Sequence, residues 1–181
     1  MAIVAESVRR YSSFFRKQQT STVLDYGTGN MRNALFMAHQ GYKVFAADIP
    51  EQIARLQGCH SANYVERLLK TDELADSQLN VDLVLSTYVF NIIMEKCERH
   101  AYIQNAAANL RQGGYLLIEV RCRNLLERCD ATCKEYFSCN ECSKTLTHDE
   151  LDALINPYGF RRISHYYRSH AVSAIFQKIH K

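Results

Sequence analysis

The sequence predicts a single α/β domain with a doubly wound, mostly parallel sheet. Apolar runs of strand length alternate along the chain with segments of helical periodicity, an order that places helices on both faces of a sheet. The apolar run at 81–85 is typical of a strand buried in a parallel sheet. A glycine turn joins the run at 22–26 to the segment at 31–40, which indicates a strand leading directly into a helix.

Local patterns support the individual elements. Thr147 and Glu150 form a capping box that opens a helix. Residues 57–80 show no clear strand. The first helix, at 2–17, carries its apolar side chains on one face, namely Val4, Val8, Tyr11 and Phe15. The other expected elements are strands at 22–26, 43–48, 81–85 and 115–120 and helices at 31–40, 98–110 and 147–156.

Composition agrees with one soluble domain over residues 1–181. Apolar residues make up 47% of the 181 residues, enough for a sizeable core. A net charge of +3 is mildly basic and neither requires nor excludes nucleic acid. No apolar stretch reaches about 18 residues, so we expect no membrane partner. Seven cysteines without a secretion signal favour the cytoplasm, with reduced thiols or metal ligands.

The glycine turn is the strongest functional signal in the chain. Its glycines allow close backbone approach to a ligand, and the following helix offers free N–H groups. Asp48 ends the next apolar run about 20 residues later, where nucleotide folds carry a carboxylate for the ribose. Arg32 replaces the third glycine of a dinucleotide fingerprint, and no Gly-Lys pair follows for a P-loop. The turn consists of Asp25, Tyr26, Gly27, Thr28, Gly29 and Asn30.

Four motifs, in order along the chain, resemble those of the class I S-adenosylmethionine (SAM)-dependent methyltransferases. The chain departs from that family at Met31, where many members carry a third glycine. The third motif of the family is not evident, with only Thr71 and Asp72 as candidates. The matching segments are 24–29 for the first motif, 44–49 for the second, 81–86 for the fourth strand, and 109–119 for the Gly-Gly turn and fifth strand.

The resemblance implies both a fold and a cofactor site. The sheet would be Rossmann-like and would close with an antiparallel pair at 159–167 and 171–178. SAM would bind at the carboxyl ends of the strands, with Asp25 fixing the turn, Asp48 accepting from the ribose and Tyr88 at the methyl-transfer face. The other implicated residues are Tyr26, Gly27, Thr28, Gly29 and Asn30 in the turn, Ile49 against the adenine, and Ser86 and Thr87 beside the methionine end.

Catalytic side chains are harder to identify from the sequence. SAM carries an already activated methyl group, so the protein mainly aligns the reactants and excludes water. A general base is needed only where the acceptor must lose a proton. We expect Tyr88 and Asn91 to act in catalysis, and further candidates for a base are Glu119, His165 and His170.

A cysteine-rich segment at 122–146 is expected as a small insertion between the fifth strand and the last helix. Its C-x3-C-x5-C-x2-C pattern could surround one zinc ion as a knuckle, with Cys122 or His148 as substitute ligands. The alternatives are unrelated free cysteines, reversible disulfides, or thiol chemistry on a soft substrate. The candidate zinc ligands are Cys129, Cys133, Cys139 and Cys142.

The sequence leaves the methyl acceptor open. Residues 86–89 do not form the Asp/Asn-Pro-Pro-aromatic motif of amino-directed DNA enzymes, and no Pro-Cys pair is present for cytosine C5 chemistry. A small molecule is therefore the first choice of substrate. Arginines and a lysine around the cysteine segment keep RNA as a rival substrate, and a non-catalytic SAM-binding scaffold with a protein partner is a third possibility.

Overall fold

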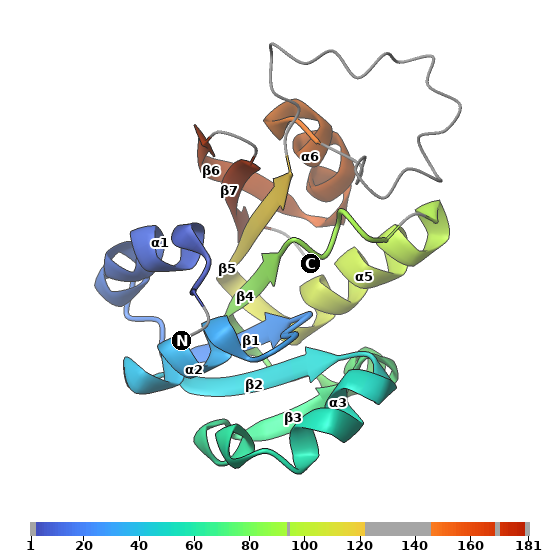
Figure 1. Cartoon of the computed structure of the whole chain (residues 1–181). Coiled ribbons are helices and arrows are strands. Elements are labelled where there is room, and N and C mark those ends of the chain that lie inside the picture. The colour runs from blue at the N-terminus through green and yellow to red at the C-terminus, as the bar shows by residue number, and fades with distance from the viewer. Residues whose placement is uncertain (1–2, 94, 122–145, 169–170, 180–181) are drawn as a thin grey trace.

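The computed structural model describes residues 3–93, 95–121, 146–168 and 171–179 and contains one seven-stranded sheet (Figure 1). The strands are β1 (Thr22–Tyr26), β2 (Lys43–Asp48), β3 (Arg67–Lys70), β4 (Val81–Thr87), β5 (Leu110–Arg121), β6 (Phe160–Arg168) and β7 (Ala171–Lys178). Their order is β3-β2-β1-β4-β5-β7-β6. The pairings from β3 to β5 are parallel, whereas β7 pairs antiparallel with β5 and β6. The predicted α/β, Rossmann-like sheet with an antiparallel C-terminal pair is confirmed.

Helices cover both faces of this sheet. One face packs against α1 (Glu6–Lys17), α2 (Arg32–His39) and α3 (Pro50–Gln57), and the other against α4 (Leu74–Ser77), α5 (Lys96–Asn109) and α6 (His148–Ile155). Short 3-10 helices are η1 (His60–Tyr64), η2 (Thr71–Glu73) and η4 (Asn156–Tyr158). Leu83 and Leu85 of β4 pack on the face covered by α1, α2 and α3, whereas Val84 packs on the opposite face, because successive strand residues point to opposite sides of the sheet. In the described part of the chain, no helix is long and apolar enough to cross a membrane.

Strands β3 and β5 differ most from the sequence expectation. β3 lies where no clear strand was evident, because it is a four-residue edge strand in which only Leu69 is buried. β5 begins at Leu110 rather than at residue 115. Leu110 already pairs with Val81, and the register then shifts so that Tyr115 lies opposite Leu83. Both differences come from strand pairing, which local periodicity does not reveal.

Arg121 and Leu146 flank the cysteine-rich segment and lie side by side. Leu146 N–H donates to the Arg121 carbonyl at 2.9 Å, and Leu146 is buried. Thr147 then caps α6 through the predicted capping box with Glu150. The insertion and its zinc stay predictions, because the proposed ligands lie outside the described residues, namely Cys129, Cys133, Cys139 and Cys142.

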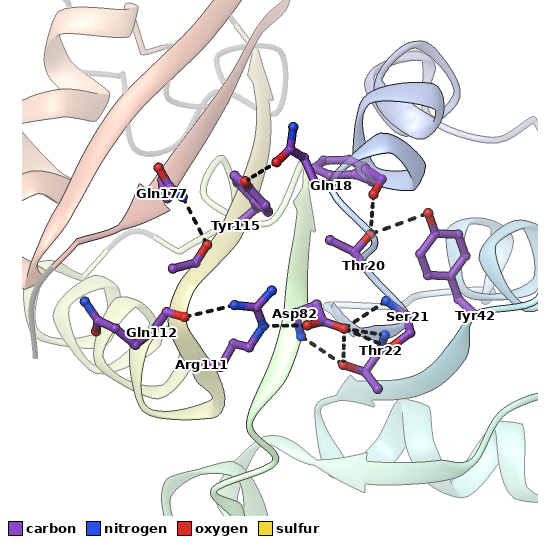
Figure 2. A network of polar contacts seen from close by, with 12 residues as sticks. Gln18, Thr20, Ser21, Thr22, Tyr42, Asp82, Arg111, Gln112, Tyr115 and Gln177 are labelled. Atoms are coloured by element: carbon purple, nitrogen blue, oxygen red, sulfur yellow. Dashed lines mark hydrogen bonds and ion pairs between the residues drawn. The ribbon is translucent and has the colours of Figure 1, made fainter.

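Asp82 ties together the amino-terminal ends of β1 and β4, at the opposite end of the sheet from the glycine turn (Figure 2). Its Oδ2 accepts from the backbone N–H groups of Ser21 and Thr22 at 2.8 and 2.9 Å, and from both of their hydroxyls. Its Oδ1 accepts from Arg111 Nε at 2.5 Å. Burial would raise the pKa of Asp82, but these hydrogen bonds together hold it well below its usual range. A carboxylate that is ionised at neutral pH therefore holds this end of the sheet together.

Candidate functional site

Gly27 lies at the exit of β1 in a conformation that glycine adopts most readily. Its φ is +86°, and a Cβ there would collide with Val89 Cγ2 in the segment after β4. The N–H groups of Gly27 and Thr28 both donate to the Ala47 carbonyl, at 2.8 and 3.0 Å. The turn is therefore held between β2 and the β4 exit, with no space for a side chain.

Asp48, at the end of β2, holds the second glycine of the turn. Its Oδ2 accepts from Gly29 N–H at 2.7 Å, and its Oδ1 accepts from Ile49 N–H at 2.8 Å. Gln52 Nε2 donates to the Gly29 carbonyl at 2.6 Å. A Cβ on Gly29 would meet no described atom within 4 Å, and both Asn30 and Ile49 are exposed. A carboxylate, open backbone and an exposed apolar side chain thus share one surface.

Asp25 connects the turn to the start of α2. The side chain is 1% exposed, and its Oδ2 accepts from Thr28 Oγ1 at 2.7 Å and from Ala34 N–H at 3.1 Å. Burial raises the pKa of Asp25 to about 6, because it outweighs the effect of these two hydrogen bonds. Asp25 therefore joins the turn to α2, and its pKa lies close to neutral pH.

Tyr26 and Ser86 are buried beneath the turn. The Tyr26 ring stacks on Tyr102 with a centroid distance of 3.9 Å. Tyr102 Oη donates to the Tyr26 carbonyl at 2.9 Å and lies 2.8 Å from Ser86 Oγ. Both side chains support the floor of the site from the α5 face. Their expected contacts with SAM would therefore involve backbone atoms.

Thr87, at the end of β4, is linked to the N-terminal segment through Asn33. Asn33 Nδ2 donates to Thr87 Oγ1 at 2.9 Å, and Asn33 Oδ1 accepts from Ala5 N–H at 3.0 Å. Asn33 lies in the first turn of α2 and is buried. The glycine turn, the β4 exit and the residue before α1 therefore meet at one place.

Tyr88 and Glu119 form a pair at the exits of β4 and β5. Tyr88 Oη donates to Glu119 Oε1 at 2.6 Å, while the Tyr88 N–H donates to the Glu119 carbonyl at 2.7 Å. Ser7 N–H at the start of α1 donates to Glu119 Oε2 at 3.2 Å. Glu119 is 5% exposed, whereas Tyr88 is 40% exposed. Burial and the neighbouring Glu119 carboxylate raise the pKa of Tyr88 well above 10.

Asn91 and His165 occupy different surroundings. Asn91 is 3% exposed, and its Oδ1 accepts from Arg121 N–H at 3.0 Å. Its catalytic role stays a prediction. The His165 ring stacks on His148 of α6 at 4.2 Å, whereas the next residue, Tyr166, packs on Tyr11 of α1. Since successive strand residues face opposite sides, His165 lies across the sheet from the Tyr88–Glu119 pair.

Sequence reasoning missed three residues of this site: Ser7, Asn33 and Gln52. Ser7 reaches a strand residue 112 positions away, and Asn33 links residues 28 and 54 positions away. No local pattern signals such contacts. His170 lies outside the described residues. Within the described ranges, no group of three or more His, Cys, Asp or Glu side chains could hold a metal ion.

Comparison with known proteins agrees with this geometry. Residues 3–177 match the family model described as "Methyltransferase domain", so the chain belongs to that methyltransferase family. It is a SAM-dependent methyltransferase with a class I, Rossmann-like fold. No curated protein sequence matches the chain.

Solved structures share the fold at low sequence identity. One is 1,6-didemethyltoxoflavin-N1-methyltransferase of Burkholderia thailandensis, with bound 1,6-didemethyltoxoflavin and S-adenosylhomocysteine. It is 21% identical with a TM-score of 0.69, over 96% of this chain and 79% of that one. Magnesium protoporphyrin IX methyltransferase of Synechocystis, with S-adenosylhomocysteine bound, is 15% identical with a TM-score of 0.69, over 96% and 82%. A putative sarcosine dimethylglycine methyltransferase of Galdieria sulphuraria is 12% identical with a TM-score of 0.74, over 96% and 86%.

Proposed function

We propose that this protein transfers a methyl group from SAM to a small-molecule acceptor. The supporting observation is the surface formed by Asp48, Gly29 and Ile49. Each Asp48 oxygen accepts a hydrogen bond from one backbone N–H, and a carboxylate oxygen can accept more than one hydrogen bond. Ribose hydroxyls can therefore join these contacts, while the exposed Ile49 offers an apolar surface for the adenine. Open space over Gly29 leaves room for the nucleoside.

The methionine end of SAM would lie between the turn and the β4 exit. Asp25 would attract the positively charged amino group, since its carboxylate is ionised above a pKa of about 6. Thr87 would line this end, and Tyr88 would face the transferred methyl group. When bound, SAM supplies a methyl group activated by its sulfonium. The protein's part is then alignment and exclusion of water.

A small acceptor agrees with the way α1 lies over the site. Ser7 contacts Glu119 and Ala5 contacts Asn33, so the chain before and at the start of α1 borders the β4 exit. Two relatives are named for small molecules, 1,6-didemethyltoxoflavin and magnesium protoporphyrin IX. The cysteine content favours a reducing, cytoplasmic location. An RNA substrate and a protein partner are the alternatives that the experiments below distinguish from a small acceptor.

Calorimetric titration tests the cofactor assignment. SAM and S-adenosylhomocysteine should bind at micromolar concentration, and NAD should not bind. Asp48→Ala should weaken SAM binding by on the order of 1–3 kcal/mol, because the ribose loses a charged acceptor. Asp48→Asn keeps one acceptor oxygen and should lose less.

Glu51→Ala is the matched control, because it removes an exposed carboxylate in the first turn of α3, three residues from Asp48. Its SAM affinity should equal that of the unchanged protein. Equal affinity in Asp48→Ala would contradict the ribose assignment. Binding of neither sulfur compound would favour a scaffold role. Retention on immobilised RNA, with a steep salt dependence, would favour the RNA substrate.

A further inference from the structure

Tyr88 has a backbone conformation that two contacts to one residue maintain. Its φ is +61°, in the left-handed region that a bulky aromatic residue rarely adopts. Glu119 holds it through both the backbone, at 2.7 Å, and the side chain, at 2.6 Å. Such conformations cluster at functional sites, where the surrounding structure maintains them.

Glu119 is fixed from both of its oxygens. Oε1 accepts from Tyr88 Oη, and Oε2 accepts from Ser7 N–H. The Ser7 hydroxyl is fully buried, and its Oγ has no hydrogen-bond partner among the described residues. A buried hydroxyl without a partner is rare in proteins and requires an explanation such as a ligand or a water molecule. A carboxylate therefore lies behind Tyr88 in a nearly closed space.

The direction of the Tyr88 hydroxyl limits its chemistry. Its single proton already points to Glu119, so the lone pairs of Oη are left for a ligand, and the Tyr88 residue as a whole is 40% exposed. The raised pKa of Tyr88 keeps the phenol protonated near neutral pH, which argues against a phenolate base. The other ionisable groups near the pair are Tyr166, Tyr11, Arg10 and Arg121.

We propose that Tyr88 and Glu119 form a proton relay, and that the acceptor is therefore a neutral nucleophile with an O–H or N–H group. The inference rests on the proposed SAM site. The acceptor's X–H bond breaks, its proton passes to Tyr88 Oη, and the Tyr88 proton passes to Glu119 Oε1. The acceptor's electron pair forms the bond to the methyl carbon, and the methyl–sulfur pair remains on sulfur. Tyr88 is the catalytic residue, and Glu119 is a positioning residue that takes the proton.

Two substitutions separate proton transfer from structure. Glu119→Gln keeps an oxygen that can accept from Tyr88 Oη, but a neutral amide cannot take up the proton. Tyr88→Phe removes the hydroxyl that connects the acceptor to Glu119 and keeps the aromatic ring. Tyr166→Phe is the matched control, since it removes the hydroxyl of a tyrosine on the edge strand β6. All three variants should bind SAM like the unchanged protein in calorimetry.

The test compares methyl transfer from SAM to catechol, to aniline and to thiophenol, which is already a thiolate at pH 8. Glu119→Gln and Tyr88→Phe should lose about 100-fold or more in kcat with catechol, the usual size of a general-base contribution. The loss with aniline should be smaller, because its nitrogen attacks with a free lone pair and its proton can leave after the methyl transfer. Transfer to thiophenolate should be unchanged, because no proton has to leave. Tyr166→Phe should keep all three rates.

A second measurement needs no acceptor. The 13Cζ NMR signal of Tyr88 should titrate at lower pH in Glu119→Gln, since the carboxylate charge that raises the pKa is gone. An unchanged titration would overturn the pairing. An unchanged kcat for catechol and aniline in both variants would overturn the relay. The relay would also be overturned if the unchanged protein methylated only thiophenolate, or none of the three acceptors. If the unchanged protein does not bind SAM in calorimetry, the proposed function itself is rejected.

Discussion

Two aspartates on neighbouring strands, Asp25 on β1 and Asp82 on β4, differ in the number of hydrogen bonds that their carboxylates accept. Asp82 accepts five hydrogen bonds at the amino-terminal end of the sheet, two each from Ser21 and Thr22 and one from Arg111 (Figure 2). Asp25, at the carboxyl end, accepts two, from Thr28 and Ala34. The Asp82 carboxylate therefore has many hydrogen-bond donors, and the Asp25 carboxylate has few.

The ionisation of the two carboxyl groups follows from this difference. Hydrogen bonds hold the pKa of Asp82 well below its usual range despite burial. Burial dominates at Asp25 and raises its pKa to about 6. A carboxylate with few donors keeps the capacity to attract a cationic ligand, at the expense of the stability of the empty protein. The comparison therefore separates a carboxylate whose ionised form the fold stabilises from one whose ionised form it destabilises.

Asp82→Ala should have the largest effect on stability. The variant leaves the N–H groups of Ser21 and Thr22 and the Arg111 guanidinium without their acceptor, at a cost on the order of 3–4 kcal/mol. Urea unfolding at pH 7 measures this loss. Asp76→Ala, which removes an exposed aspartate in α4, should change stability by less than about 0.5 kcal/mol. Equal losses in the two variants would contradict the structural role of Asp82.

Ionisation of Asp25 should lower the free energy of unfolding as pH rises, which is the opposite of the pH dependence expected for Asp82. Its folded pKa is raised, so the folded state favours the protonated form, and stability falls as pH rises from about 4 through about 6. Two pKa units correspond to roughly 3 kcal/mol. Asp25→Asn should remove this slope in urea unfolding between pH 4 and 8. A slope that persists in the variant would mean that another group causes it. Asp82, whose folded pKa is lowered, stabilises above pH 4 and loses that contribution only in stronger acid.

The glycine turn at the carboxyl end of the sheet could be predicted from the sequence because its determinants are local. Gly27 and Gly29 have positive φ angles, and the expected carboxylate at Asp48 reaches the turn directly. Met31, where the family often has glycine, also has a positive φ of 60° and is fully buried. The family's glycine preference therefore reflects a conformation that this chain keeps with a larger residue. Packing of the Met31 side chain offsets the backbone cost.

The contacts around Tyr88 and Glu119 could not be predicted in the same way. Tyr88 and Glu119 were candidates, but their pairing depends on the register that places Thr87 beside Glu119. Ser7 joins them only because α1 packs over the β5 exit. Likewise, the contacts of Asp82 cross 60 residues to Thr22 and 29 to Arg111. Sequence periodicity indicates which residues lie on a strand, whereas the pairing of strands decides which side chains meet.

Matched hydroxyl deletions should give the smallest effects and compare the two aspartates most directly. Ser21→Ala removes one of five donors to Asp82, and Thr28→Val removes one of two donors to Asp25. Each should cost about 1 kcal/mol at pH 7, the usual contribution of one hydrogen bond. Only Thr28→Val should also change the pH profile, because the loss of its hydroxyl raises the pKa of Asp25 further and moves the stability decline to higher pH. Urea unfolding from pH 4 to 8 measures both variants. Parallel profiles would show that Asp25 does not depend on its few donors, and the contrast with the saturated Asp82 would then have no consequence for ionisation.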